Sequence, residues 1–282
     1  DLETANVLPA GADLHDYMPL DISVAATAID GGEEKLWYSF DDGSPASKMS
    51  RETAQELLMY LSKKQSEGYM VCGWNSLSFD FYCLAGASGM YTKSAEIAKK
   101  SYDPMYQFFN HFGFYIGLQA VADGMDLKFK KSLKGSDVPS LWQQRKYEAI
   151  FPYVMDDCKV VNQIVKQIMD TKWIVWKSKK GDYPTRCLGN LHTCEYVMSR
   201  EMADQSWMTG TVPQKWSSTK WFPDIAFPSD HMGARPPQGM GVNLFQVSGA
   251  DKNTAQDVVL ELEASNYEHA LNKANAMGIF VS

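Results

Sequence analysis

Apolar and polar residues in the first part of the chain follow patterns that predict strands before helices. Two runs rich in β-branched and aromatic residues, 22–30 and 34–40, flank the pair Gly31-Gly32, which is typical of a β-hairpin. Ser50 then precedes a segment whose apolar residues recur at helical spacing. This arrangement predicts a helix that Ser50 caps at its N-terminus.

The middle of the chain combines one short apolar run with several helical segments. Residues 69–74 form the apolar run, which is typical of a buried strand. Helices are predicted at about 79–86, 92–100, 104–112 and 152–170. Pro152 suits the first turn of the last helix. Strands first, followed by mixed strand and helix, predict an α/β fold whose sheet is partly antiparallel.

Composition changes twice beyond the main domain, which we place at residues 1–172. The segment 173–227 is irregular and rich in tryptophan, and we expect it to pack as an extension on the main domain. Residues 228–241 are rich in proline and glycine, which is typical of a linker. The remaining segment, 242–282, predicts a small ββαβ module with a structural role or a protein partner.

Net charge, cysteines and hydropathy narrow the class of protein. The 282 residues carry a net charge of −7, whereas a general nucleic-acid coat protein is usually basic. A nuclease stays compatible with this charge, because cations held by carboxylates reverse the local field. Five scattered cysteines without a CxxC pair predict reduced thiols and a cytoplasmic location. No apolar run reaches about 18 residues, so we expect no membrane partner.

Three short patterns carry the candidate chemistry. Asp1 and Glu3 are two residues apart, so a strand would place both carboxylates on one face. Asp80 lies where the predicted strand 69–74 meets the next helix, and Tyr153 lies one helical turn before Asp157. Each pattern alone is common, and a lone Asp80 would more often cap a helix. Four converging carboxylates would repel one another unless divalent cations were bound between them.

The order of these patterns resembles the DEDD, or DnaQ-like, superfamily of 3′→5′ exonucleases, in its tyrosine subclass. The chain reads DxET, then N-x-x-x-FD, then YxxxD, and the resemblance extends over residues 1–170. Segments 103–125 and 130–142 are similar to a bacterial branch of that family. The resemblance implies a ribonuclease-H-like mixed sheet flanked by helices.

The same resemblance implies the roles of the site residues. Asp1, Glu3, Asp80 and Asp157 would hold two Mg²⁺ or Mn²⁺ ions, with Asp80 acting on the second ion through water. Tyr153 would orient the attacking water by a hydrogen bond, since a phenol with a pKa of about 10 is a poor base at neutral pH.

Several neighbouring residues have less specific predictions. Thr4 and Asn75 are candidate contacts to the terminal nucleotide, with a turn or cap role as the alternative. Lys131 and Lys134 belong to a basic run that contacts phosphates or forms a solvated loop. Asp103 is expected to be structural. We also expect Asp156 to point away from Asp157, because adjacent helical residues diverge, and His111 and His192 to have no catalytic role.

The leading hypothesis is a nuclease that hydrolyses phosphodiester bonds at the 3′ end of single-stranded DNA or RNA. The alternative is a catalytically silent ribonuclease-H-like module that binds nucleic acid or protein. The choice between DNA and RNA stays open, since it depends on contacts to the 2′-hydroxyl. Because a central strand is usually buried on both faces, we expect a short β-rich stretch to precede Asp1 in the full gene product.

Overall fold

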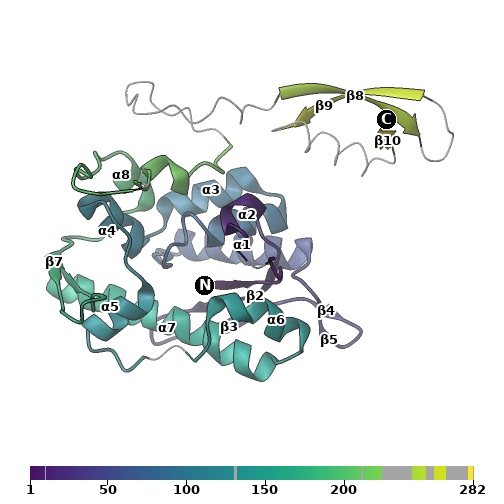
Figure 1. Ribbon diagram of the computed structural model, residues 1–282. Helices are drawn as coiled ribbons and strands as arrows, with labels where there is room; N and C mark the ends of the chain where they lie inside the picture. The colour runs from purple at the N-terminus through teal and green to yellow at the C-terminus, as the bar shows by residue number, and fades with distance from the viewer. Residues whose placement is uncertain are drawn as a thin grey trace. The chain divides into compact units, whose positions relative to one another are not determined.

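The computed structural model describes residues 1–9, 11–129, 132–210 and 212–223, together with the backbone of three strands in the range 243–281. The chain divides into two compact units, Asp1–Ile225 and Ala226–Ser282. Within the described residues no helix is both long enough and apolar enough to span a membrane. The first unit is mixed α/β and contains the whole candidate site (Figure 1).

A three-stranded antiparallel sheet forms the centre of the first unit, in the order β1 (Leu2–Thr4), β2 (Ile22–Ala28) and β3 (Glu34–Trp37). Leu2 pairs with Ala25, and Ala25 pairs with Trp37 on the other side. The β2–β3 pair is the hairpin that the sequence predicts. Two short strands, β4 (Phe40–Asp41) and β5 (Ser44–Pro45), form a separate pair after it.

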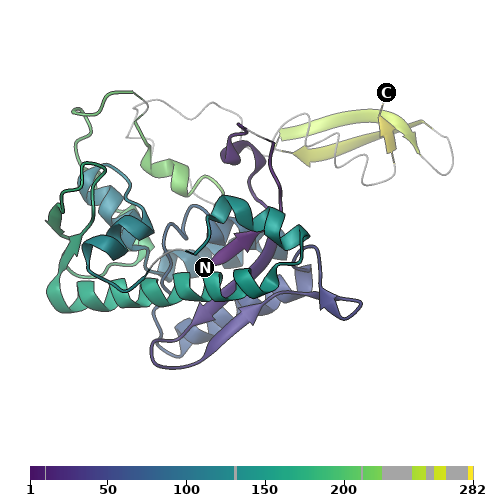
Figure 2. The same cartoon turned by 60° about the horizontal axis from the view of Figure 1, so that its bottom comes forward.

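Helices cover both faces of this sheet. Alternation along β2 sends Ala25 to the side of Leu57, which lies on α1 (Arg51–Ser66). Val24 and Ala26 face the other side and pack with Val154 of α7 (Tyr147–Thr171). Figure 2 shows α7 running along the sheet. The long helix therefore closes the face opposite to α1.

The predicted cap of α1 is confirmed. Ser50 accepts a hydrogen bond of 3.2 Å from the backbone N–H of Thr53 at the first turn. Three predicted helices are also present, as α2 (Asp80–Ser88), α3 (Tyr91–Lys100) and α4 (Pro104–Phe112). The remaining helical segments of the first unit are η1 (Leu14–Tyr17), α5 (Leu118–Gly124), η2 (Gly135–Asp137), α6 (Val138–Gln143), α8 (Cys194–Met198) and η3 (Lys215–Ser218).

The prediction of a buried strand at 69–74 is wrong. Only Cys72 makes a ladder contact, an isolated parallel bridge to Tyr102, and the side chains of Tyr69 and Met70 are each 47% exposed. A strand needs continuous pairing along an edge, and this segment has such pairing for one residue only. The apolar run therefore borders an open groove instead of filling the interior.

The position of Pro152 also differs from the prediction. The helix begins at Tyr147, so Pro152 is its sixth residue and not part of its first turn. The additional turn is stabilised by packing, because Ile150 is fully buried and the ring of Tyr147 contacts Trp142 edge-on at 4.8 Å. Tertiary packing here outweighs the hydrogen bond that proline cannot donate.

The tryptophan-rich extension packs on the main domain through two of its tryptophans. Trp176 and Trp221 are buried, whereas Trp173 and Trp207 are 49% and 60% exposed. The extension also contains the hairpin of β6 (Trp173–Val175) and β7 (Thr185–Cys187). The packing prediction thus holds for part of the set.

The second unit contains an antiparallel sheet in the order β10-β8-β9. Its strands are β8 (Asn243–Asp251), β9 (Asp257–Ala264) and β10 (Ile279–Val281), which match the three predicted strands. The predicted linker at 228–241 and the helix predicted between the second and third strands lie outside the described residues.

Candidate metal centre

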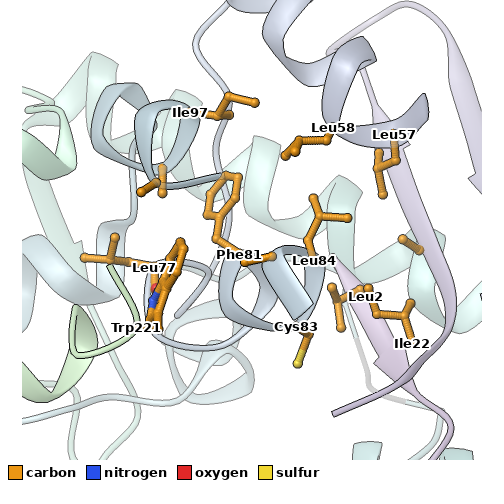
Figure 3. Close-up of a cluster of buried hydrophobic side chains, with 14 of the residues drawn as sticks. Leu2, Ile22, Leu57, Leu58, Leu77, Phe81, Cys83, Leu84, Ile97 and Trp221 are labelled. Atoms are coloured by element: carbon orange, nitrogen blue, oxygen red, sulfur yellow. The ribbon is translucent and has the colours of Figure 1, made fainter. Parts of the chain in front are cut away.

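The apolar face of β1 fixes the position of the acidic residues. Leu2 is buried in a cluster with Ile22, Leu57 and Leu84, which come from β2, α1 and α2 (Figure 3). Because side chains alternate along a strand, the residues on both sides of Leu2 point to the opposite face. The predicted shared face of Asp1 and Glu3 follows from this alternation.

Carboxylates of Asp1, Glu3 and Asp157 meet on that opposite face. One oxygen from each of the three lies within 4.8 Å of the others. Glu3 and Asp157 are 7% and 2% exposed, and Asp1 is partly buried. The neighbouring Asp156 is exposed to solvent, as the helical geometry predicts. The sequence motifs on β1 and α7 therefore converge in space, across more than 150 residues of chain.

Asp80 is attached to the same strand by a different contact. It is the first residue of α2, and its Oδ1 accepts a hydrogen bond of 3.0 Å from the backbone N–H of Leu2. Burial raises the pKa of the Asp80 carboxyl, against the opposing effect of the α-ammonium group of Asp1. Asp80 is not a member of the three-carboxylate group among the described residues. The fourth acid thus lies beside the cluster and is bonded to its backbone.

Tyr153 lies on the same face of α7 as Asp157 and is 2% exposed. A β-carbon built on Gly135 would lie 3.9 Å from both the Tyr153 hydroxyl and Oε2 of Glu3. The Tyr153 hydroxyl and the Glu3 carboxylate therefore border one backbone position at the start of η2. Lys134, the residue before Gly135, is exposed at the rim of the site. Lys131 lies outside the described residues.

Asn75 has a structural role in the turn that leads to α2. Its backbone is in the left-handed region, with φ of 61°, and its side-chain oxygen accepts a short hydrogen bond from the Ser78 hydroxyl. Its N–H donates to Oδ1 of Asp103 at 3.1 Å. Thr4 lies in β1 and is 9% exposed, so little of its side chain is accessible to a nucleotide.

Asp103 holds this turn against α4. Oδ1 also accepts from the N–H of Tyr106 and Oδ2 accepts from the N–H of Leu77, each at 3.1 Å. Burial raises the pKa of Asp103 to about 6, although three N–H donors oppose the shift. The expectation of a structural role for Asp103 is consistent with these contacts.

The donor set suits a hard divalent cation. Carboxylate oxygens are the ligands that Mg²⁺ and Mn²⁺ prefer, and three of them at this spacing repel one another without a cation. Oδ2 of Asp1 is buried and has no hydrogen-bond partner among the described residues, which leaves it available as a ligand. His111 and His192 line a separate surface hollow with Tyr196 and belong to no cluster of metal-ligating groups in the described ranges.

Sequence reasoning missed two features of the site. Gly135 has no signal in the sequence, because its importance comes from a loop folding over β1. Cys158, next to Asp157, donates from Sγ to the carbonyl of Ala26 at 3.2 Å and so fixes α7 against β2. Comparison with protein-family models, with curated proteins and with solved structures finds no match for this chain.

Proposed function

We propose that this chain is a two-metal-dependent 3′→5′ exonuclease with a ribonuclease-H-like fold, acting on the 3′ end of single-stranded DNA or RNA. The observation that carries the proposal is the convergence of Asp1, Glu3 and Asp157 within 4.8 Å. The antiparallel order β1-β2-β3, with the last acid on a helix across the sheet, supports the finer fold assignment.

The acids of the site would hold Mg²⁺ or Mn²⁺. Asp1, Glu3 and Asp157 are the ligands of one ion, and Asp80, beside them, serves a second through water. Such ions lower the pKa of a bound water and stabilise the charge that develops on the phosphate and on the leaving 3′-oxygen. Burial of Glu3 and Asp157 excludes bulk water and strengthens their hold on a cation.

Tyr153 is the residue that orients the attacking water. Its hydroxyl reaches the same backbone position as the Glu3 carboxylate, so a water near Glu3 lies within reach of its hydrogen bond. A phenol is a weak base near neutral pH, so Tyr153 positions the water and does not remove its proton.

Attraction of a polyanion has to be local, because the whole chain carries a charge of −7. Lys134 is exposed beside Gly135 and can contact a phosphate as the strand approaches the carboxylates. Neutralisation of one phosphate by this lysine makes binding depend on salt concentration.

The test is incubation of 3′- and 5′-labelled DNA and RNA with Mg²⁺ or Mn²⁺, and with EDTA in parallel. The proposal expects shortening from the 3′ end only, abolished by EDTA. Asp157→Asn should lose activity by at least about 100-fold, which is typical for removal of a group that stabilises charge in the transition state. Asp156→Asn is the matched control, one residue away and exposed, and should keep full activity.

The same assay separates the proposal from its alternative. Binding of labelled strands without hydrolysis under every metal condition would favour the silent nucleic-acid-binding module. Shortening from the 5′ end, or equal activity of the Asp157→Asn and wild-type proteins, would contradict the proposed site.

A further inference from the structure

An apolar groove with a volume of about 680 Å³ lies in the layer of the sheet, next to the beginning of β1. One of its edges is β2, and the other is the segment 69–74 that the sequence predicts as a strand. Residues of α1 and α7 cover its two faces. The groove therefore has a helix on each face and a backbone segment on each edge, as the place of a central strand would have.

The β2 edge presents hydrogen-bonding groups to the groove. Ala26 exchanges two hydrogen bonds with Asp1, from N–H to O at 2.9 Å and from O to N at 3.2 Å. In an antiparallel ladder the groups of every second residue point the same way, so those of Ala28 face the groove. The carbonyl of Ala28 accepts from the Asn162 side chain at 3.0 Å. Its N–H has no hydrogen-bond partner among the described residues.

The opposite edge has the same property. The carbonyl of Val71 accepts from the N–H of Tyr102 at 2.8 Å, and the N–H of Gly73 donates to the Tyr102 carbonyl at 3.2 Å. The backbone groups of Cys72, between them, consequently point away from Tyr102 and toward the groove that Cys72 lines. Both edges thus offer a ladder to a strand placed between them.

Side chains on both faces of the groove are apolar along its length. Leu57 and Leu61 come from α1, and Val161 and Val165 come from α7. An extended chain would send alternate side chains to these two faces, so both sets should be apolar. From Asp1 to the turn after β2 the space accommodates about four residues, at roughly 3.4 Å each.

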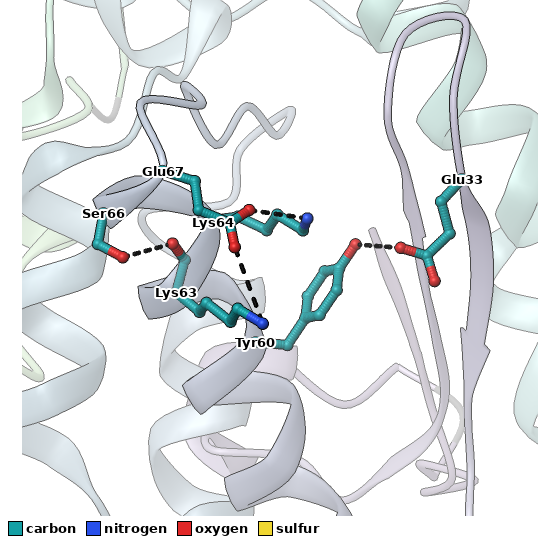
Figure 4. A network of polar contacts seen from close by, with 6 residues as sticks. All are labelled: Glu33, Tyr60, Lys63, Lys64, Ser66 and Glu67. Carbon is teal, nitrogen blue, oxygen red and sulfur yellow. Dashed lines mark hydrogen bonds and ion pairs between the residues drawn. The ribbon is translucent and has the colours of Figure 1, made fainter.

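The far end of the groove is polar and open to solvent. Tyr60 of α1 lines the groove there and donates from its hydroxyl to Oε2 of Glu33 at 3.2 Å, in the turn after β2 (Figure 4). Lys64 lies beside it and pairs with Glu67 at 2.9 Å. A strand in the groove would therefore leave the apolar interior at this end.

We propose that the groove is a strand site that holds one extended, apolar polypeptide segment, running in line with β1 and antiparallel to β2. The occupant that fits is polypeptide joined to the nitrogen of Asp1, because the ladder between Asp1 and Ala26 continues directly to Ala28. A compact apolar ligand would fill the volume but would leave the N–H groups of Ala28 and Cys72 without partners, at about 1–3 kcal/mol each.

The test compares two chains extended at Asp1. One has four β-branched apolar residues added before Asp1, and the other has a Gly-Ser segment of equal length. Amide hydrogen exchange is measured at Ala28 and Cys72, with Gly181 in an exposed turn as the internal reference. The apolar extension should slow exchange at Ala28 and Cys72 by at least about 10-fold and raise Tm by roughly 3 °C, whereas the Gly-Ser extension should change neither.

A second readout uses the dye 8-anilinonaphthalene-1-sulfonate, which fluoresces in apolar cavities. The apolar extension should abolish dye binding that the Gly-Ser extension retains. Equal exchange rates, or equal dye fluorescence, in the two extended chains would overturn the proposal. Neither measurement needs a metal ion or nucleic acid, so the result does not depend on the nuclease assignment.

Discussion

The backbone N–H of Leu2 donates a hydrogen bond of 3.0 Å to Oδ1 of Asp80, so the fourth acid is joined to the strand that carries the first two. Leu2 itself is buried among apolar side chains and points away from the carboxylate cluster. This single bond therefore couples the apolar core on one face of β1 to the acidic site on the other. Changes at Asp80 should affect stability as well as activity.

Asp80→Ala and Asp80→Asn separate these two effects. Relief of a buried charge alone would favour both variants. Alanine also leaves the N–H of Leu2 without an acceptor, at a cost of about 1–3 kcal/mol, whereas asparagine keeps an oxygen there. We expect Asp80→Ala to unfold at lower urea concentration than Asp80→Asn, and both to lose activity. Equal unfolding midpoints would show that the Leu2–Asp80 bond contributes nothing to stability.

Binding of Mn²⁺ should stabilise the folded chain through the carboxylate cluster. A ligand at 100 times its Kd adds about 2.7 kcal/mol, which corresponds to a Tm increase of roughly 5–10 °C. Asp157→Asn should lose this increase and Asp156→Asn should keep it, as thermal unfolding with and without Mn²⁺ will show. A shift of the same size in both variants would place the ion elsewhere.

Tyr153→Phe removes one hydroxyl and leaves the ring buried on α7. We expect kcat to fall by about 10–1000-fold, the range for a group that positions a proton-transfer partner. The Mn²⁺-induced Tm increase should stay at the wild-type value, because the metal ligands are intact. An unchanged kcat at saturating metal would remove Tyr153 from the reaction.

Local patterns were sufficient for much of the fold and the site. The hairpin of β2 and β3 follows from Gly31-Gly32 between β-rich runs, and the cap at Ser50 follows from its place before a helical pattern. Residue spacing also predicted the shared faces of Asp1 with Glu3 and of Tyr153 with Asp157. Each of these inferences depends on contacts between residues close in sequence.

Features that depend on distant segments could not be predicted in this way. The run 69–74 has the composition of a strand, but strand formation requires a neighbouring edge that composition does not reveal. The approach of Gly135 to Glu3 requires the fold of the loop before α6. Likewise, Asp103 resembles an ordinary helix cap in the sequence, whereas it also accepts two hydrogen bonds from the turn before α2.

The pKa of Asp103 predicts how stability depends on pH. Burial raises it to about 6, so between about pH 4 and pH 6 the folded state binds a proton that the unfolded state has lost. This contribution to stability is present below pH 4 and is lost as pH rises to 6, by at most about 3 kcal/mol.

Wild type should accordingly gain stability relative to Asp103→Asn as pH falls from 7 to 4. Urea unfolding of both proteins at several pH values measures this difference, and pH effects from other groups cancel in the subtraction. A difference that stays constant, or that grows with rising pH, would contradict the raised pKa.

The extension beyond α7 should stabilise the candidate site through Trp221. Its ring stacks on Tyr82 of α2 with centroids 5.8 Å apart, and its Nε1 donates to the carbonyl of Leu77 at 2.9 Å, three residues before Asp80. Trp221→Ala should cost about 3–5 kcal/mol, as for other buried tryptophans. Trp207→Ala is the matched control, since this tryptophan is 60% exposed, and should change stability by less than about 0.5 kcal/mol. Chemical unfolding of the two variants gives both values, and equal losses would show that the extension does not stabilise the segment leading to Asp80.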